Sequence, residues 1–211
     1  MFRASVAMLA IAAIGAAGAV LAEDASTLAA GTCAACHGAT GVSSNPQYPN
    51  LAGQKPAYLR RQLDAFRSGD RKSELMDGFA AALSDAEIAG LATFYARQPP
   101  APVEQDKSGL AAAGRRIYRA RGRGSPACAD CHGSAGRFGF GGGMMGGGMM
   151  AGMRTDPAIT PRLNRQHAPY LSATLDAFAK GTRIDATMAP IAAALTEAQR
   201  KAVAAYLAGL R

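Results

Sequence analysis

The sequence predicts an all-α protein made of two tandem copies of one module. Two Cys-x-x-Cys-His motifs occur, and a longer segment that begins at Pro49 recurs from Pro161, an offset of 112 residues. Apolar residues recur at helical spacing in both copies, and no alternating run is long enough to indicate a strand. With 211 residues and 49% hydrophobic content, the chain can form two domains of ~100 residues and is too apolar to be disordered.

Residues 1–22 have the features of a secretory signal peptide. Arg3 gives a short basic start, an apolar run follows, and Val20 and Ala22 place small residues at the −3 and −1 positions of a cleavage site. An uncleaved membrane anchor is the alternative. The run is mostly Ala and Gly, however, whereas a spanning helix needs ~20 strongly apolar residues. We therefore expect an exported mature chain that begins at Glu23.

The mature chain is expected to divide into a first domain at residues 23–97 and a second domain at residues 108–211. A Pro-rich linker at residues 98–107 joins them. The two Cys pairs are only 95 residues apart, so the second copy carries 17 extra residues, visible as a Gly/Met-rich insert at residues 138–154. We expect this insert to be a flexible surface loop, because Gly-rich tracts behave as coil. A Cu(I) site and a rival iron ligand are the alternatives for its five methionines.

Each copy should contain a helix before its Cys pair, a helix that begins within the repeated segment and a helix at its end. The first of these are expected at residues 25–30 and 110–120. Pro56 suits the first position of the middle helix and Gly69 its C-terminal cap, and the second copy repeats this pattern over residues 169–181.

Capping boxes predict where the last helix of each copy begins. Ser84 is followed three residues later by Glu87, and Thr196 is followed in the same way by Gln199. Apolar residues then recur at helical spacing, so each copy should end in an amphipathic helix.

The Cys-x-x-Cys-His motifs have the spacing of covalent haem attachment sites. Two thiols on one helical turn can each add to a haem vinyl group, and the adjacent histidine can ligate the iron. A thioredoxin-like redox pair would need a βαβ context, and a structural zinc ion would need a fourth ligand in both copies. We therefore expect two covalently bound haem c groups. The residues that would hold them are Cys33, Cys36 and His37 in the first copy and Cys128, Cys131 and His132 in the second.

Met76 and Met188 are the expected ligands on the opposite faces of the irons. After signal removal Met76 is the only methionine before the insert, and Met188 is its repeat partner. Both are predicted to lie in loops just before the last helix. A thioether opposite imidazole is the usual ligation of an electron-transfer haem, and it leaves no open position for a substrate. His167 aligns with Lys55 of the first copy, so we expect an exposed loop side chain there and not a ligand.

The motifs CAACHG and PNLAGQ, the later methionine and the Leu-Ser-Asp capped helix ending in Phe-Tyr-Ala resemble the di-haem cytochrome c4 family over nearly all of the mature chain. The resemblance implies two tandem cytochrome c class I-like domains in the periplasm. It implies a carrier, not an enzyme, that moves electrons between a quinol-oxidising complex and a terminal oxidase. It also implies that the carbonyls of Pro49 and Pro161 accept hydrogen bonds from the ligating histidines, and that Leu51 and Leu163 pack against the haem edges.

Two alternatives belong to other functional classes. One is the cytochrome subunit of a periplasmic dehydrogenase, such as a sulfide-oxidising flavocytochrome, which would carry an exposed apolar interface. The other is a di-haem peroxidase, in which one iron would lack its methionine.

Charge is divided unevenly along the chain. Residues 23–106 contain 7 basic and 10 acidic side chains, a net charge of −3, whereas residues 107–211 contain 15 basic and 5 acidic side chains, a net charge of +10. Five arginines precede the second Cys pair: Arg115, Arg116, Arg119, Arg121 and Arg123. We expect redox proteins as partners and no nucleic acid, and the basic region could steer the chain towards an acidic protein or the periplasmic face of the inner membrane.

Overall fold

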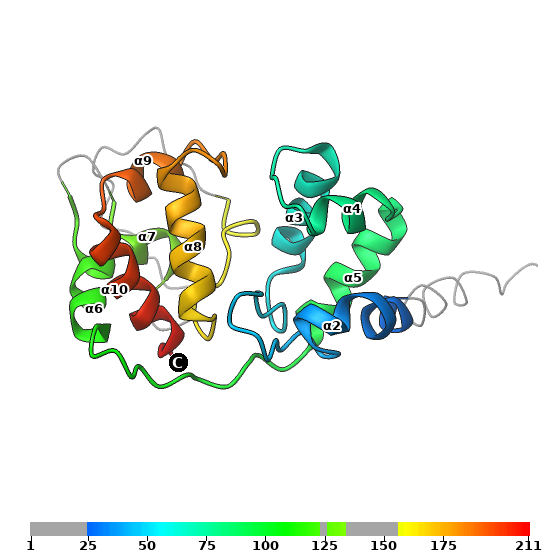
Figure 1. Ribbon diagram of the computed structural model, residues 1–211, viewed down its shortest axis with the longest axis horizontal. Helices are drawn as coiled ribbons and strands as arrows, with labels where there is room; N and C mark the ends of the chain where they lie inside the picture. The colour runs from blue at the N-terminus through cyan, green and yellow to red at the C-terminus, as the bar shows by residue number, and fades with distance from the viewer. Residues whose placement is uncertain (1–24, 123–125, 134–155) are drawn as a thin grey trace, which may run out of the picture.

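The computed structural model describes residues 25–122, 126–133 and 156–211. The predicted signal peptide and the Gly/Met-rich insert lie outside these residues. The described residues form two groups of helices placed side by side, as Figure 1 shows. The described residues contain no strand, and an isolated antiparallel bridge joins Arg71 and Arg183. The predicted all-α fold class is therefore confirmed.

The first domain begins with a helical stretch that carries the first Cys pair. From residue 25 the chain runs through a π-helical segment, η1 (Ala29–Cys33), into α2 (Ala34–His37). Three helices follow: α3 (Pro56–Ser68), α4 (Met76–Ala81) and α5 (Asp85–Arg97). The first stretch, α3 and α5 enclose the core of this domain, which contains Ala29, Leu59, Leu91 and Tyr95.

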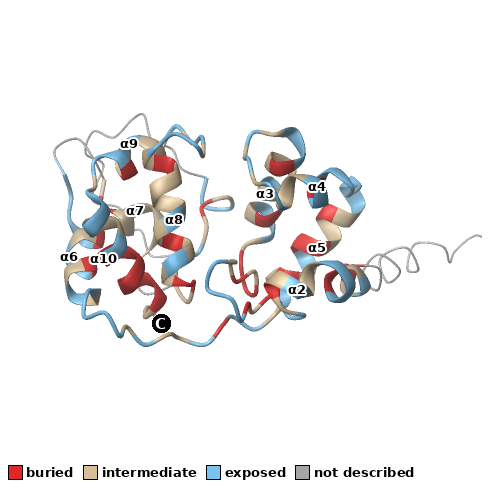
Figure 2. Cartoon of the chain, in the orientation of Figure 1, coloured by how far each residue is buried: buried red, intermediate tan, exposed pale blue. Residues whose placement is uncertain are grey.

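The second domain repeats this arrangement. Its helices are α6 (Ala111–Arg119), α7 (Cys128–His132), α8 (Ala168–Ala179), α9 (Met188–Ala193) and α10 (Glu197–Ala208). The last turns of α10 are buried, as Figure 2 shows, because this helix packs against both α6 and α8. Gly114 and Tyr118 of α6 are buried, and Tyr118 forms a core with Val203 and Leu207.

The helix ends follow the local sequence signals. Pro56 starts α3, and Gly69 caps it in the left-handed conformation, with φ of 82°. Both capping boxes are present, because the side chains of Ser84 and Thr196 accept hydrogen bonds from the backbone N–H three residues later. These boundary predictions are confirmed.

The segment at residues 98–110 contains no helix and connects α5 to α6 along one side of the molecule (Figure 1). It is attached to the second domain: the Glu104 N–H donates to the carbonyl of Ala208, and Arg165 donates to the carbonyl of Ala101 at 3.1 Å. Ala101 is 3% exposed. The linker is therefore a bound part of the fold.

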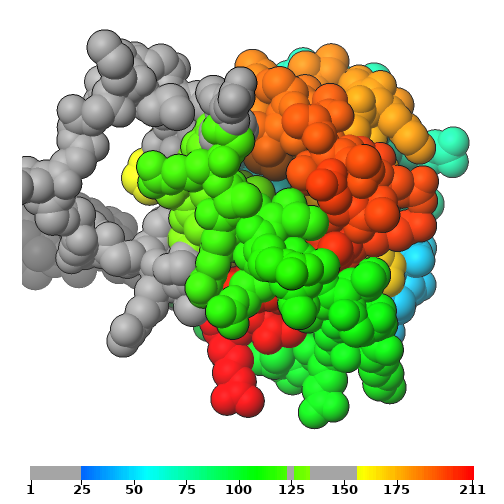
Figure 3. Space-filling view, turned by 90° about the vertical axis from the view of Figure 1, so that its left-hand side faces the viewer, coloured from blue at the N-terminus to red at the C-terminus, as the bar shows by residue number. Residues whose placement is uncertain are grey.

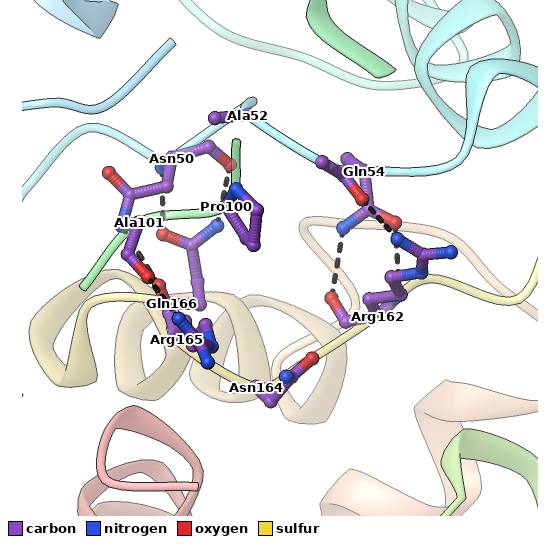
Figure 4. Close-up of a pocket in the computed structure, with 10 residues that line it drawn as sticks. Asn50, Ala52, Gln54, Pro100, Ala101, Arg162, Asn164, Arg165 and Gln166 are labelled. Atoms are coloured by element: carbon purple, nitrogen blue, oxygen red, sulfur yellow. Dashed lines mark hydrogen bonds between the residues drawn. The ribbon is translucent and has the colours of Figure 1, made fainter. Parts of the chain in front are cut away.

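The two domains contact each other through a pseudo-two-fold set of hydrogen bonds. The backbone N–H of Asn50 donates to Gln166 Oε1, and Gln166 Nε2 donates back to the Asn50 carbonyl, at 2.8 and 2.9 Å. Gln54 exchanges the same two bonds with the backbone of Arg162, both at 2.9 Å. Gln166 lies 112 positions after Gln54, and Arg162 lies 112 positions after Asn50, so the two pairs are equivalent in the repeat. Figure 4 shows both pairs around a small cavity of about 210 Å³.

Candidate haem sites

Helical turns position the cysteines and the histidine of each motif. Cys33 ends η1 and Cys36 and His37 lie in α2, whereas all three equivalents, Cys128, Cys131 and His132, lie in α7. All four cysteines are half-buried, and none of them is paired in a disulfide. Burial raises the pKa of the Cys33 and Cys128 thiols. Each site thus presents two thiols and one imidazole on a single turn of helix.

The two histidines are held in the same orientation by the same type of contact. His37 Nδ1 lies 3.0 Å from the carbonyl oxygen of Pro49, and His132 Nδ1 lies 3.1 Å from that of Pro161. Because a carbonyl only accepts, the proton sits on Nδ1 in both rings. These contacts confirm the prediction for the two proline carbonyls.

The histidine rings are suited to bind iron through the other nitrogen. Burial lowers the pKa of His37 and His132, which keeps both imidazoles neutral. Within the described parts of the chain, Nε2 of neither ring makes a hydrogen bond. A neutral imidazole with Nδ1–H bonded to a carbonyl is the usual form of a metal-ligating histidine. The donor set of each site therefore fits a covalently attached haem.

The zinc alternative does not fit the geometry. Among the residues that the structure describes, no three His, Cys, Asp or Glu side chains come together as they would around a metal ion. The cysteines also lie in an all-helical setting, without the βαβ context of a thioredoxin-like pair.

The prediction that Met76 and Met188 lie in loops was wrong. Each is the first residue of a short helix, Met76 of α4 and Met188 of α9. The reason is local: the Met76 N–H donates to Ser73 Oγ at 3.2 Å, and the Met188 N–H donates to Asp185 Oδ1 at 2.9 Å. These bonds satisfy backbone donors that the first helical turn leaves unpaired. Both methionines are half-buried, and their assignment as iron ligands stays a prediction.

Leu51 and Leu163 occupy equivalent positions two residues after the prolines. Each is half-buried and packs against the hydrophobic core of its own domain. Their contact with a haem edge remains a prediction.

His167 is not an exposed loop residue, so that prediction was wrong. It caps α8, is only 8% exposed and lies where three segments meet. Nδ1 contacts the carboxylate of Glu104 in the linker, and Nε2 lies 3.0 Å from the carbonyl of Ser43 in the first domain. His167 of the second domain therefore connects the linker to the first domain.

The polar residues of the domain interface were not predicted from the sequence. Gln54 and Gln166, Tyr58 and Tyr170, and Arg71 and Arg183 are identical pairs at the repeat offset, and members of each pair contact the other domain. The available signal was that these residues, whose polar types usually lie on the surface, are identical in the two copies of the repeat.

Two equivalent Cys-x-x-Cys-His sites on two helical domains define a di-haem c-type cytochrome. The family model "Cytochrome c" matches residues 22–96, and the model "Cytochrome C oxidase, cbb3-type, subunit III" matches residues 109–207. The chain is 39% identical to cytochrome c4 of Thiocapsa roseopersicina over 185 residues, which cover 85% of this chain and 88% of the relative. The chain therefore belongs to the cytochrome c4 family.

Other similar proteins agree with this assignment. The crystal structure of reduced recombinant cytochrome c4 from Pseudomonas stutzeri is similar with a TM-score of 0.74 and 30% identity, covering 90% of this chain and 98% of that one. A thiosulfate dehydrogenase electron acceptor of Thiomonas intermedia (strain K12) is 36% identical over 189 residues, covering 85% of this chain and 78% of the relative. The chain is an electron-transfer protein, not an enzyme, and carries two covalently attached haem c groups. None of its described helices has the length and hydropathy needed to cross a membrane.

Proposed function

We propose that this protein is a periplasmic carrier that moves electrons between a quinol-oxidising complex and a terminal oxidase. The observation that supports this most directly is the repeated contact between His Nδ1 and a proline carbonyl, at 3.0 Å in one domain and 3.1 Å in the other. Two sites with the same ligand orientation suit a protein that takes in an electron at one haem and releases it at the other.

The proposed roles follow the repeat. The thiols of Cys33 and Cys36 and of Cys128 and Cys131 would anchor the two haems, and His37 and His132 would bind iron. Met76 and Met188 would supply the remaining iron ligands. When bound, each haem would supply one-electron redox chemistry. The chain contributes fixed ligands and a water-poor pocket, and thioether ligation favours the reduced state.

We expect mass spectrometry of the mature protein to show two haems per chain and an N-terminus at Glu23. Replacing both Cys128 and Cys131 with alanine should remove one haem mass and leave the first site intact, because each site draws its anchors from a single helical segment. Replacing Thr93 with alanine is a control and should keep both haems, because Thr93 is exposed and its hydroxyl bonds only to the Ala89 carbonyl within α5. A wild-type mass with one haem or none would contradict the proposal.

The second domain offers a surface for orienting a partner. Arg115, Arg116 and Arg119 of α6 are exposed, and none of them forms an ion pair with another described residue. The same helix covers much of the face drawn in Figure 3, whereas its buried side packs on α10. Arg121 differs, because it pairs with Asp130 at 3.0 Å. This α6 basic face (Arg115, Arg116 and Arg119) would attract an acidic redox partner.

Changing all three arginines of the α6 basic face to glutamine should lower the second-order rate of electron transfer to the native oxidase roughly tenfold at low salt. Steering acts through long-range charge, so the difference should vanish at ~1 M salt, where the Debye length is about 3 Å. The matched control removes three basic residues from the first domain: Arg60, Arg67 and Arg97. Stopped-flow spectroscopy measures the rate of electron transfer for both triple variants at low and at high salt. Equal losses in the two triple variants would point to net charge alone, and a salt-independent rate would exclude steering.

The second candidate is the electron acceptor of a periplasmic dehydrogenase. It is favoured by the relative from Thiomonas intermedia, whose name is thiosulfate dehydrogenase electron acceptor. A sulfide-oxidising flavocytochrome is another periplasmic dehydrogenase that could donate electrons to this protein. Purified donors distinguish the candidates: the enzyme that reduces the protein at a rate close to its own turnover is the physiological one. Reduction by the quinol-oxidising complex alone supports the first candidate, and reduction by the dehydrogenase alone supports the second.

A further inference from the structure

One peptide group in the first domain connects the histidine of its Cys-x-x-Cys-His motif to the second domain. This is the peptide between Pro49 and Asn50. Its carbonyl oxygen accepts a hydrogen bond from His37 Nδ1 at 3.0 Å. Its N–H donates to Oε1 of Gln166, in the second domain, at 2.8 Å. Because the carbonyl and the N–H belong to one planar, conjugated unit, Gln166 lies a single peptide group away from His37.

The second domain contains the same arrangement with the two domains exchanged. The carbonyl oxygen of Pro161 accepts a hydrogen bond from His132 Nδ1 at 3.1 Å. The next N–H, that of Arg162, donates to Oε1 of Gln54, in the first domain, at 2.9 Å. Figure 4 shows each glutamine reaching the backbone of the other domain. Each domain thus bonds to the peptide that orients the histidine of the other.

The carboxamides of both glutamines are fixed by their own domains. Gln54 Oε1 also accepts from the backbone N–H of Lys55, and Gln166 Oε1 accepts from that of His167, both at 3.0 Å. Lys55 and His167 are the N-cap residues of α3 and α8, so each carboxamide is tied to the start of a helix. Both glutamines are buried. The cross-domain bonds therefore come from side chains that hold one orientation.

A hydrogen bond at the N–H of a peptide strengthens the bond at its carbonyl, because linked hydrogen bonds polarise one another. The proline carbonyl then binds the Nδ1–H of the histidine more tightly. A tighter bond at Nδ1 fixes the ring and raises the basicity of the other ring nitrogen, which would bind the iron. A more basic ligand favours the oxidised, more positively charged iron. Contact with the other domain should therefore lower the reduction potential.

We propose that Gln54 and Gln166 are positioning residues, each of which tunes the histidine that would ligate iron in the opposite domain. Gln166 acts on His37 and Gln54 acts on His132, each through one proline carbonyl. This inference rests on the proposed role of the two histidines as iron ligands and not on the identity of the electron donor or acceptor. Because coupling between two equilibria is reciprocal, reduction of either iron weakens the contact between the domains.

The test compares Gln166→Leu and Gln54→Leu with the wild-type holoprotein in equilibrium redox titrations that follow each haem separately by NMR. Leucine is close to glutamine in size but makes no side-chain hydrogen bond. Gln166→Leu should shift the ratio of oxidised to reduced haem in the first domain roughly threefold towards reduced, about 28 mV for a one-electron couple. The haem of the second domain should keep its potential. Gln54→Leu should give the converse pattern.

Exchange of the histidine proton gives a second readout. The Nδ1 proton of His37 should exchange with solvent faster in Gln166→Leu than in the wild type, because its bond to the proline carbonyl is weaker. The Nδ1 proton of His132 should respond in the same way to Gln54→Leu. Exchange rates equal to those of the wild type in both variants would overturn the proposal.

Gln62→Leu is the matched control for loosening of the domain contact. Gln62 of the first domain also bonds to the second domain, accepting from Arg183 at 2.8 Å, but neither of its bonds involves a proline peptide. We expect no crossed pattern in this variant. Equal shifts of both haems in Gln166→Leu, or a shift no larger than that in Gln62→Leu, would show that Gln166 acts only through the domain contact and would overturn the proposal.

Mass and optical spectra first establish that each variant holds two low-spin haems. A wild-type protein with one haem or none contradicts the proposed function, whereas two intact haems without the crossed pattern contradict this inference alone. Gln166→Asn and Gln54→Asn keep an amide on a shorter side chain, so they serve as the test if the leucine variants fold poorly. They should shift the same haems in the same direction by a smaller amount. A shift confined to the haem of the substituted domain would overturn the proposal.

Discussion

Replacing Met188 with alanine is expected to convert only the second haem to a high-spin or misligated form with a lowered reduction potential. The first haem should be unaffected, because Met188 opens α9 in the second domain, whereas Met76, the ligand proposed for the iron of the first domain, opens α4. Loss of the soft sulfur ligand removes a contact that favours reduced iron. The weak near-infrared band of methionine-ligated ferric haem should fall by half.

Met76→Ala is the matched variant and should produce the converse pattern, with the first haem altered and the second intact. The two single variants together assign each spectrum to a domain. Both haems remaining low-spin in Met188→Ala, with the near-infrared band at full strength, would show that a methionine of residues 138–154 ligates the second iron.

Replacing Gly114 with alanine is expected to cause the largest loss of stability. Gly114 is buried where α6 crosses α10, and a Cβ atom there would overlap the carbonyl oxygen of Ala202 and lie 2.8 Å from Tyr206 Cβ. Both helices would have to move apart, because the obstructing atom belongs to backbone. Overpacking of this kind costs about 2–3 kcal/mol, which lowers the melting temperature of a ~100-residue domain by roughly 10–20 °C. Thermal unfolding, monitored through the haem absorbance, measures this fall in melting temperature.

Gly31→Ala is the control for this change. Gly31 also lies in a helical segment, but a Cβ atom there would meet no atom within 4 Å. The melting temperature of the Gly31→Ala protein should stay close to that of the wild type. A Gly114→Ala protein as stable as Gly31→Ala would mean that the crossing of α6 and α10 is looser than the structure indicates.

The features that could be predicted from sequence are those encoded over short distances or by repetition. Pro56, Gly69 and the two capping boxes act within one helical turn, so their effects were readable directly. The repeat placed the second domain once the first was understood. The starts of α4 and α9 are also locally encoded, because the side chains of Ser73 and Asp185 accept hydrogen bonds from the N–H groups of the methionines three residues later.

The features that escaped prediction depend on contacts across the chain. His167 bonds to residues 63 and 124 positions away, and nothing in its neighbourhood distinguishes it from an exposed loop histidine. The same holds for Arg71, whose partner Tyr170 is 99 positions away. Such contacts exist only after both domains have folded and docked, so local patterns carry no record of them.

The pairing of Asn50 with Gln166 and of Gln54 with Arg162 has a consequence for how tightly the two halves must bind. A surface that repeats the same bonds about a pseudo-two-fold axis has the form of a contact between identical subunits. Here the segment at residues 98–110 makes that contact intramolecular, and a short linker sets an effective concentration in the millimolar range. The halves therefore stay together with an intrinsic affinity far weaker than a free dimer would need. A contact between two tethered halves can open and re-form without either half losing its partner.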